Sequence, residues 1–313
     1  MNQVSSEIKA EDGDNMISRS QLFCVLILSK LSAAVVFPYS REFSGTGLLA
    51  LIAAEAAELL LALPLLIYSV RRGDFYGSLK RKNAVIGVAA GYGAAFLTAF
   101  CGARTLVYSA EFAQRTLLGG MSGAVILVLM AMFALYAAFC GAEALSRSGV
   151  LILAVAVIVT VAVAIGCIPH IHLRRAAGAE YDELFVHQFL ERLMSSGEYL
   201  ILAAMLPHIR EKNGKSGAGA TGFLYGFTAL AGVFVIELFC IGVLGEFYTI
   251  AEYPLTAAAQ LSDVTLFKRL DGFMGAVWSL GAAFRAGALF YSSYNAIKAV
   301  SGTKRASAER SGA

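Results

Sequence analysis

Long apolar stretches, separated by short charged or glycine-containing segments, recur along almost the whole chain. A helix of about 20 apolar residues is long enough to cross the hydrocarbon layer of a bilayer. The pattern therefore predicts an all-α polytopic membrane protein with eight transmembrane helices, at about 17–38, 47–69, 83–110, 120–144, 148–168, 185–207, 219–245 and 270–299. We expect one membrane domain over residues 17–299, preceded by a polar cytoplasmic N-terminus (1–16) and followed by a disordered basic tail (300–313).

Two of the predicted helices carry polar residues near their middle. These lie at 29–32 in the first helix and at 195–197 in the sixth, and we expect both helices to be interrupted there. The third and eighth helices are long, as steeply tilted spans are. Pairing the first helix with the sixth and the third with the eighth gives an offset of five helices, which is typical of inverted-repeat transporters that hold a substrate at broken helices. The alternative is that serine and glycine only allow close helix packing.

Arg285 lies inside the last predicted helix, about 15 residues from its start. At about 1.5 Å per residue it is about 22 Å along the helix, near the middle of a hydrocarbon layer about 30 Å thick. An arginine at that depth needs a carboxylate, backbone carbonyls or a water-filled cavity. We expect its partner to be Glu198 in the interrupted sixth helix or Glu237 in the seventh. The guanidinium would suit a ligand carboxylate, and a purely structural ion pair is the alternative.

Other charged residues also lie within the apolar stretches. Glu55 and Glu58 are three positions apart on one face of the second helix, near the predicted depth of Lys30. We therefore expect Lys30 to contact one of these two carboxylates. Glu143 and Arg147 are four positions apart near the cytoplasmic end of the fourth predicted helix, and we interpret them as a local structural pair.

Composition and charge agree with a membrane protein and exclude several other classes. Hydrophobic residues make up 58% of the 313 positions and charged residues 15%, and the mean hydropathy is +0.68. With the N-terminus inside, fifteen Lys and Arg fall in cytoplasmic segments and seven outside, which predicts that both termini are cytoplasmic. The net charge of +3 gives no support for nucleic-acid binding. The five cysteines are scattered singly, and His170 and His172 alone are too few ligands for a zinc site, so no metal or cofactor is expected.

Several short motifs occur together between residues 17 and 299. They are Ile17-Ser18 with Gln21-Leu22, the spacing of Tyr136, Gly141, Glu143 and Arg147, Pro207 followed by a basic loop, Tyr253-Pro254, Lys268-Arg269-Leu270-Asp271, Trp278, and the run from Phe284-Arg285 to Tyr291. Together they resemble the B-subunit of spore germinant receptors, the endospore germination permease family. That family belongs to the amino acid, polyamine and organocation permease superfamily, which has the LeuT-like fold.

The resemblance implies a non-enzymatic membrane subunit that senses a germinant, often an amino acid, in the spore inner membrane. It implies partners as well, namely an A-subunit membrane protein and a C-subunit lipoprotein. Because the family normally has ten helices and this chain stops soon after the eighth, we expect the last two helices to be missing. The implied ligand-binding residues lie on the first, sixth and eighth helices. They are Lys30, Leu31, Ser32, Ala33, Ser195, Ser196, Gly197, Glu198 and Arg285.

Two other functions remain open at this point. The chain could be a secondary amino acid permease that uses the same site in alternating access, or an assembly subunit that binds no ligand. No motif resembles a nucleophile with its base or a phosphate-binding loop, so neither an enzyme nor an ATP-driven pump is predicted.

Overall fold

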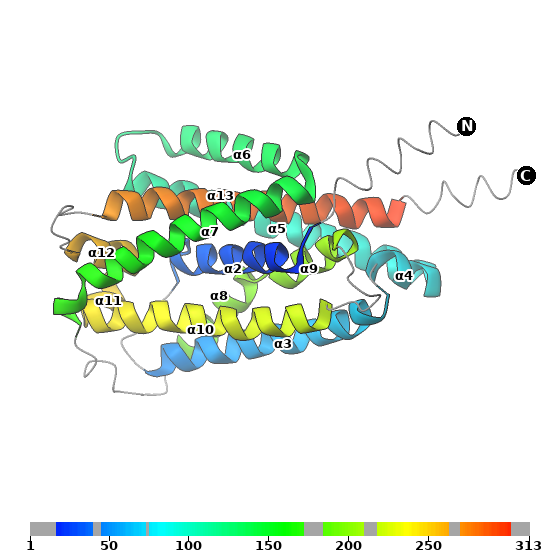
Figure 1. Ribbon diagram of the computed structural model, residues 1–313, viewed down its shortest axis with the longest axis horizontal. Coiled ribbons are helices and arrows are strands. Elements are labelled where there is room, and N and C mark those ends of the chain that lie inside the picture. The colour runs from blue at the N-terminus through cyan, green and yellow to red at the C-terminus, as the bar shows by residue number, and fades with distance from the viewer. Residues whose placement is uncertain are drawn as a thin grey trace, which may run out of the picture.

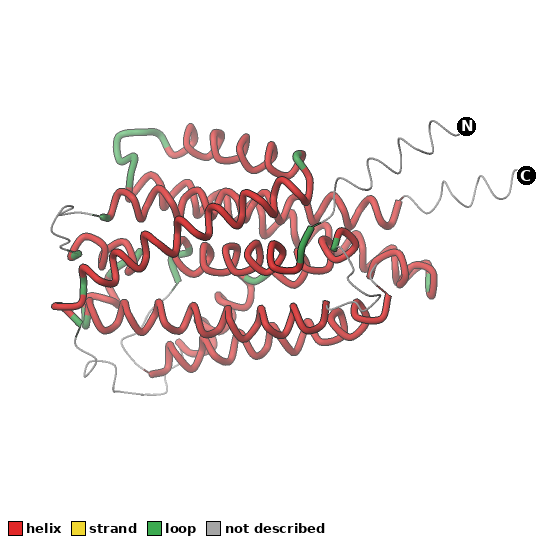
Figure 2. The backbone as a smooth tube through the Cα atoms, in the orientation of Figure 1, coloured by secondary structure: helices red, strands yellow, loops and turns green. Residues whose placement is uncertain are grey.

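The computed structural model describes residues 17–39, 45–72, 75–171, 184–209, 218–262 and 270–301. Within these ranges the chain forms helices joined by loops, without a strand (Figure 2). The long helices are α2 (Arg19–Val36), α3 (Gly45–Arg72), α5 (Ala84–Thr116), α6 (Gly123–Phe139), α7 (Gly141–Gly166), α10 (Ala218–Leu244) and α13 (Asp271–Ser301). The short ones are α4 (Phe75–Lys82), α8 (Leu184–Ser195), α9 (Glu198–Met205), α11 (Phe247–Ile250), α12 (Pro254–Leu261) and the 3-10 turns η1 (Ile168–His170) and η3 (Leu206–His208).

Among the described helices, six are long and apolar enough to cross a membrane, namely α2, α3, α5, α7, α10 and α13. The prediction of an all-α polytopic membrane protein is therefore confirmed. The helix α6 has 17 residues, and the sixth predicted span is divided between α8 and α9. The count of eight spans and the LeuT-like arrangement stay predictions. The N-terminal segment 1–16 and nearly all of the tail predicted at 300–313 lie outside the described residues.

The sequence explains where two of the long helices begin. Ser18 and Gln21 form a capping box at the start of α2, in which each side chain accepts a hydrogen bond from the backbone N–H of the other residue. The side chain of Asn83 accepts from the N–H groups of Val85 and Ile86 at the start of α5. These bonds satisfy backbone donors that have no partner inside the helix.

Two predictions about helix boundaries are wrong. The first helix is not interrupted at residues 29–32, because α2 runs continuously from Arg19 to Val36. Residues 29–32 include neither glycine nor proline, and side chains of other helices satisfy the polar groups of Ser29 and Lys30, so the helical backbone stays continuous there. The fourth predicted span ends at Phe139, and Cys140 joins it directly to α7. Glu143 and Arg147 therefore pair in the first turns of α7, and not at the end of the preceding helix.

The helices α13 and α2 lie at the centre of the bundle, with α6 on one side and α3 and α10 on the other (Figure 1). Glycine allows two close approaches to α13. A Cβ atom at Gly281 would lie 2.6 Å from the hydroxyl oxygen of Ser32 on α2, and one at Gly287 would lie 2.9 Å from the carbonyl oxygen of Ala134 on α6. Small residues let helix backbones meet closely inside a membrane, where lipid tails compete for the same apolar contacts.

Different loops lie at the two ends of the bundle. At one end, the N–H of Ile17 donates to the carbonyl oxygen of His208 at 2.8 Å, and Lys80 donates to the carbonyl oxygen of Val300. At the other end Arg115 pairs with Glu252. The structure thus places together Ile17, Lys80, His208 and Val300, which border segments that the charge pattern assigns to the cytoplasm.

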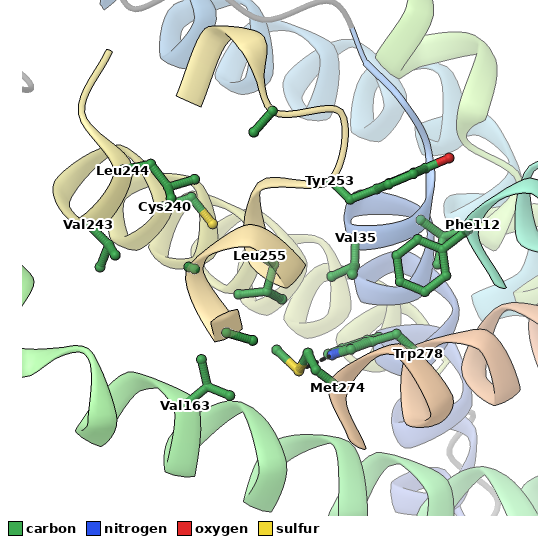
Figure 3. Packing of buried hydrophobic residues seen from close by; sticks show 14 of the residues in the cluster. Val35, Phe112, Val163, Cys240, Val243, Leu244, Tyr253, Leu255, Met274 and Trp278 are labelled. Carbon is green, nitrogen blue, oxygen red and sulfur yellow. Dashed lines mark hydrogen bonds between the residues drawn. The ribbon is translucent and has the colours of Figure 1, made fainter. Parts of the chain in front are cut away.

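An apolar cluster closes the end of the bundle opposite to Ile17. Trp278 packs there with Val35, Phe112 and Tyr253, and its indole N–H lies 3.2 Å from the sulfur of Met274 (Figure 3). Buried residues of α2, α5, α7, α10, α11, α12 and α13 and of the loop before α12 contribute to this cluster. It anchors α12 against α2 and α13, beyond the buried polar groups at the middle of the bundle.

Candidate functional site

The sixth predicted span is broken at Ser196 and Gly197, which separate α8 from α9. The hydroxyl groups of Ser195 and Ser196 both donate to the carbonyl oxygen of Arg192, at 2.7 and 3.2 Å. These bonds satisfy a backbone acceptor at the end of α8 that would otherwise need another helical turn. The interruption predicted at residues 195–197 is confirmed.

Arg285 on α13 is fully buried beside this break, and its nitrogen atoms all have partners. Nε and Nη2 both lie 2.9 Å from Oε1 of Glu198, and Nη1 donates to the hydroxyl oxygen of Thr105 at 2.7 Å. Nη2 also donates to the carbonyl oxygen of Ser195, and the guanidinium carbon lies 5.3 Å from the ring centroid of Phe37. Of the two carboxylates predicted for Arg285, the structure selects Glu198.

Glu198 completes the other side of the break. Its Oε2 accepts the backbone N–H of Gly197 at 2.9 Å, and its Oε1 accepts the hydroxyl group of Ser29 on α2 at 2.9 Å. A carboxylate thus lies at the N-terminus of α9, while the guanidinium of Arg285 lies at the C-terminus of α8. Each charge is at the helix end whose dipole it complements, so this one ion pair stabilises both ends of the break.

Lys30 forms a second buried cluster on the other side of the break. Its Nζ lies 2.7 Å from Oε1 of Glu55 and 2.7 Å from Oε2 of Glu58, and it donates to the hydroxyl oxygen of Ser196 at 3.1 Å. The predicted contact of Lys30 with one of these carboxylates is confirmed, and the structure adds the second. All three charged residues are under 9% exposed.

A third buried ion pair joins α8 to α10. Nη2 of Arg192 lies 2.8 Å from Oε1 of Glu237, whose other oxygen accepts the hydroxyl group of Tyr248. The guanidinium carbon of Arg192 lies 4.9 Å from the ring centroid of Tyr39, and the Tyr39 hydroxyl is 2.7 Å from that of Ser195. Glu237, the second carboxylate considered for Arg285, therefore belongs to Arg192.

The three buried clusters carry unequal numbers of positive and negative groups. They contain the cations of Lys30, Arg192 and Arg285 and the carboxylates of Glu55, Glu58, Glu198 and Glu237. With every group ionised, one carboxylate is in excess, and it belongs to the pair that shares Lys30. An uncompensated buried charge is costly, so this position favours either a proton on one of the two carboxylates or an additional positive group.

A cavity of about 290 Å³ opens between this cluster and the broken helix. Its lining consists of the polar residues Glu58, Ser196 and Tyr199, of Gly197, and of the apolar residues Leu61, Ala62, Leu65, Leu97, Leu193 and Leu200. Oε1 of Glu58 and the hydroxyl group of Tyr199 are buried without a hydrogen-bond partner. Leu61 and Leu97 are largely exposed, so the cavity reaches the outer surface of the bundle.

The predicted site residues fall into two groups in the structure. Ser195, Ser196, Gly197, Glu198 and Arg285 come together at the break, and Lys30 reaches them through Ser196. The predicted site residues that follow Lys30 on α2 lie away from the break. Leu31 and Ala33 pack in apolar clusters, and the buried hydroxyl group of Ser32 faces the close approach of α2 to Gly281.

Two residues of the site were not found from the sequence. Thr105 and Tyr199 are single polar residues within apolar helices, where they are hard to distinguish from packing residues. Their position within an apolar stretch was the one signal that the sequence offered. Within the described residues, no group of three His, Cys, Asp or Glu could hold a metal ion.

Comparison with known families now adds to this geometry. Residues 88–307 match the model of the spore permease family, described as spore germination protein. The chain belongs to this family. It is a family of permease-type membrane proteins and not a family of enzymes, and the chain is a multi-pass membrane protein related to germination. A search of curated proteins finds no match.

The family match covers the two clusters of this site unequally. Glu198, Arg285 and Thr105 lie within the matched residues, whereas Lys30 and the two carboxylates that it contacts lie before residue 88. The ion pair across the broken helix therefore belongs to the part of the chain that defines its family. The match gives no information on the Lys30 cluster.

Proposed function

We propose that this protein is the germinant-sensing membrane subunit of a spore germination receptor. In this proposal it binds a small amino-acid-like ligand at mid-membrane, beside the break between α8 and α9, in the inner membrane of the spore. It acts together with an A-subunit membrane protein and a C-subunit lipoprotein. The observation that carries the proposal is the cavity that Ser196 and Gly197 border at the break, in a chain of the germination family.

The lining of the cavity supports a ligand with a positive group and an apolar body. The unpartnered oxygen of Glu58 can accept hydrogen bonds from an ammonium group, and Tyr199 and Ser196 line the same cavity. Leucine side chains form most of the remaining wall, which suits an aliphatic side chain. A ligand carboxylate could reach Arg285 only by displacing Glu198, because Arg285 has no exposed surface.

The same contacts provide a route from the ligand to the rest of the bundle. Arg285 donates hydrogen bonds to the carbonyl oxygen of Ser195, the last residue of α8, and to the carboxylate of Glu198, the first residue of α9. A shift of either half-helix therefore changes the contacts of Arg285. Through Arg285 the shift reaches α13, which packs against α2, α5, α6 and α7. In this proposal ligand binding is thus converted into a movement of the central helix.

Replacement of Gly197 by leucine tests the proposal. A Cβ atom at Gly197 would lie 3.1 Å from a methyl carbon of Leu289 and 3.9 Å from Cys101, so a leucine would press α9 away from α13 and α5. We expect Gly197→Leu to abolish the germination response of spores while membrane insertion is retained. Gly93→Leu is the matched control, since a Cβ atom at Gly93 would meet nothing within 4 Å. A normal response from a well-expressed Gly197→Leu variant would show that the break serves only packing.

Two other functions make different predictions for the same purified chain. A secondary amino acid permease would accumulate its substrate in proteoliposomes, whereas a sensor would bind the ligand without moving it. An assembly subunit would bind no ligand at all. Uptake and equilibrium binding, measured on one preparation, separate the three.

A further inference from the structure

A space between α6 and α13, here called the wedge, lies toward the end of the bundle that holds Ile17 and Val300. The two helices cross closely at Gly287 and Ala134. Beyond this crossing they enclose a cavity of about 540 Å³, whose apolar walls are Leu135, Ala138, Phe139, Phe290 and Ile297. Phe139 is 86% exposed, so the wedge is open toward the surrounding lipid. Gly141, with a φ of 87°, also lines it and provides the backbone conformation for the sharp turn from α6 into α7.

The inner wall of the wedge is polar. His208, Asn295 and Lys298 line both this cavity and an adjoining one of about 250 Å³. The amide nitrogen of Asn295 is buried without a hydrogen-bond partner, whereas Lys298 is exposed. Tyr76 of α4 lines the smaller cavity, and burial raises the pKa of its phenol to about 12. This hydroxyl group therefore stays protonated and is a hydrogen-bond donor at neutral pH.

The charges around the wedge are mainly positive. None of the described residues that line the two cavities carries a carboxylate. Glu143, near the start of α7, is paired with Arg147. The short helix α4 ends in basic residues, of which Arg81 and Lys82 are exposed, and Lys80 ties it to the end of α13. A short helix with aromatic and basic residues suits the interface between lipid and water.

We propose that this wedge is a binding site for an anionic phospholipid of the cytoplasmic leaflet. Its phosphate group is bound by Lys298 and Asn295, and its acyl chains lie between α6 and α13. Basic pockets between membrane helices on the cytoplasmic side favour such lipids, because anionic headgroups are concentrated in that leaflet. The site is separate from the cavity at the broken helix, so the proposal does not depend on the germinant.

Native mass spectrometry of the full chain, purified in a neutral detergent, tests the site. Phosphatidylglycerol and phosphatidylcholine with the same acyl chains are added in turn, and inorganic phosphate is added separately. We expect phosphatidylglycerol to be retained preferentially, and inorganic phosphate not to compete with it at equal concentration. Lys298→Gln should weaken its binding about fivefold, the effect of about one basic residue at a membrane surface. Ala138→Trp, which fills the wedge but keeps the lysine, should also weaken it.

The matched control is Lys82→Gln, which removes an exposed lysine of the same end that lines neither cavity. It should leave phosphatidylglycerol binding unchanged. Equal retention of both lipids, or an equal loss in the Lys298 and Lys82 variants, would overturn the proposal, because attraction would then be unspecific. Full competition by inorganic phosphate, or unchanged binding in Ala138→Trp, would overturn it as well, since the wedge would then hold no lipid chain.

Discussion

Replacing Arg285 by alanine removes a group that is bonded to both ends of the broken helix. Arg285→Ala leaves the carboxylate of Glu198 buried, with Ser29 and the N–H of Gly197 as its remaining donors. It also deprives the carbonyl oxygen of Ser195 of its bond to the guanidinium. We therefore expect a strong loss of stability together with a loss of the germination response.

The expected magnitude follows from the burial of the pair. Arg285 and Glu198 both have 0% exposed side chains, so water cannot replace the lost partner. Breaking one partner of a buried ion pair typically costs about 3–5 kcal/mol. This corresponds to a decrease of roughly 10² to 10³ or more in the ratio of folded to unfolded protein. The surface pair of Arg147 with Glu143 provides a control, since Arg147→Ala at a 71% exposed side chain should cost about 1 kcal/mol or less.

The assay compares single and double variants for thermal aggregation in detergent and for the germination response. Arg285→Met combined with Glu198→Gln removes both charges and should recover most of the lost stability, because no charge is left buried alone. Recovery of stability without response would mean that Arg285 also acts in sensing, and recovery of both would leave it a structural residue. If Arg285→Ala is as stable as the unmodified chain, the reasoning from the buried pair is refuted.

Two further predictions concern the Lys30 cluster and the membrane orientation. Lys30→Met leaves two buried carboxylates without their shared cation, whereas Glu55→Gln leaves Lys30 paired with Glu58. Lys30→Met should therefore lower the midpoint temperature of thermal aggregation more than Glu55→Gln does. The reverse order would contradict the count of buried charges. In a chain without its native cysteines, Lys82→Cys should be labelled from the cytoplasmic side by an impermeant reagent and Glu252→Cys from outside. Labelling of both from one side would refute the predicted topology.

The sequence alone determined the class of the protein and the approximate position of most of its long helices. Hydropathy is a local property, so apolar stretches of sufficient length predicted membrane helices, and charged loops predicted their grouping at the two ends. The interruption at residues 195–197 was also predictable, because serine and glycine disfavour a continuous helix and supply local hydrogen bonds. For Arg285, the sequence established the need for a buried partner and reduced the choice to two carboxylates.

Only the tertiary structure decided which groups meet. Glu198 is 87 positions from Arg285, and its contact depends on the relative depth and rotation of α9 and α13, which a pattern along one helix does not encode. For the same reason the sequence could not show that α2 stays continuous, because Ser29 and Lys30 are satisfied by side chains of other helices. The wedge beside α13 likewise depends on the crossing of two helices at Gly287. Three-dimensional packing determines which side chains of different helices contact each other, whereas the residues of each helix determine that the helix forms.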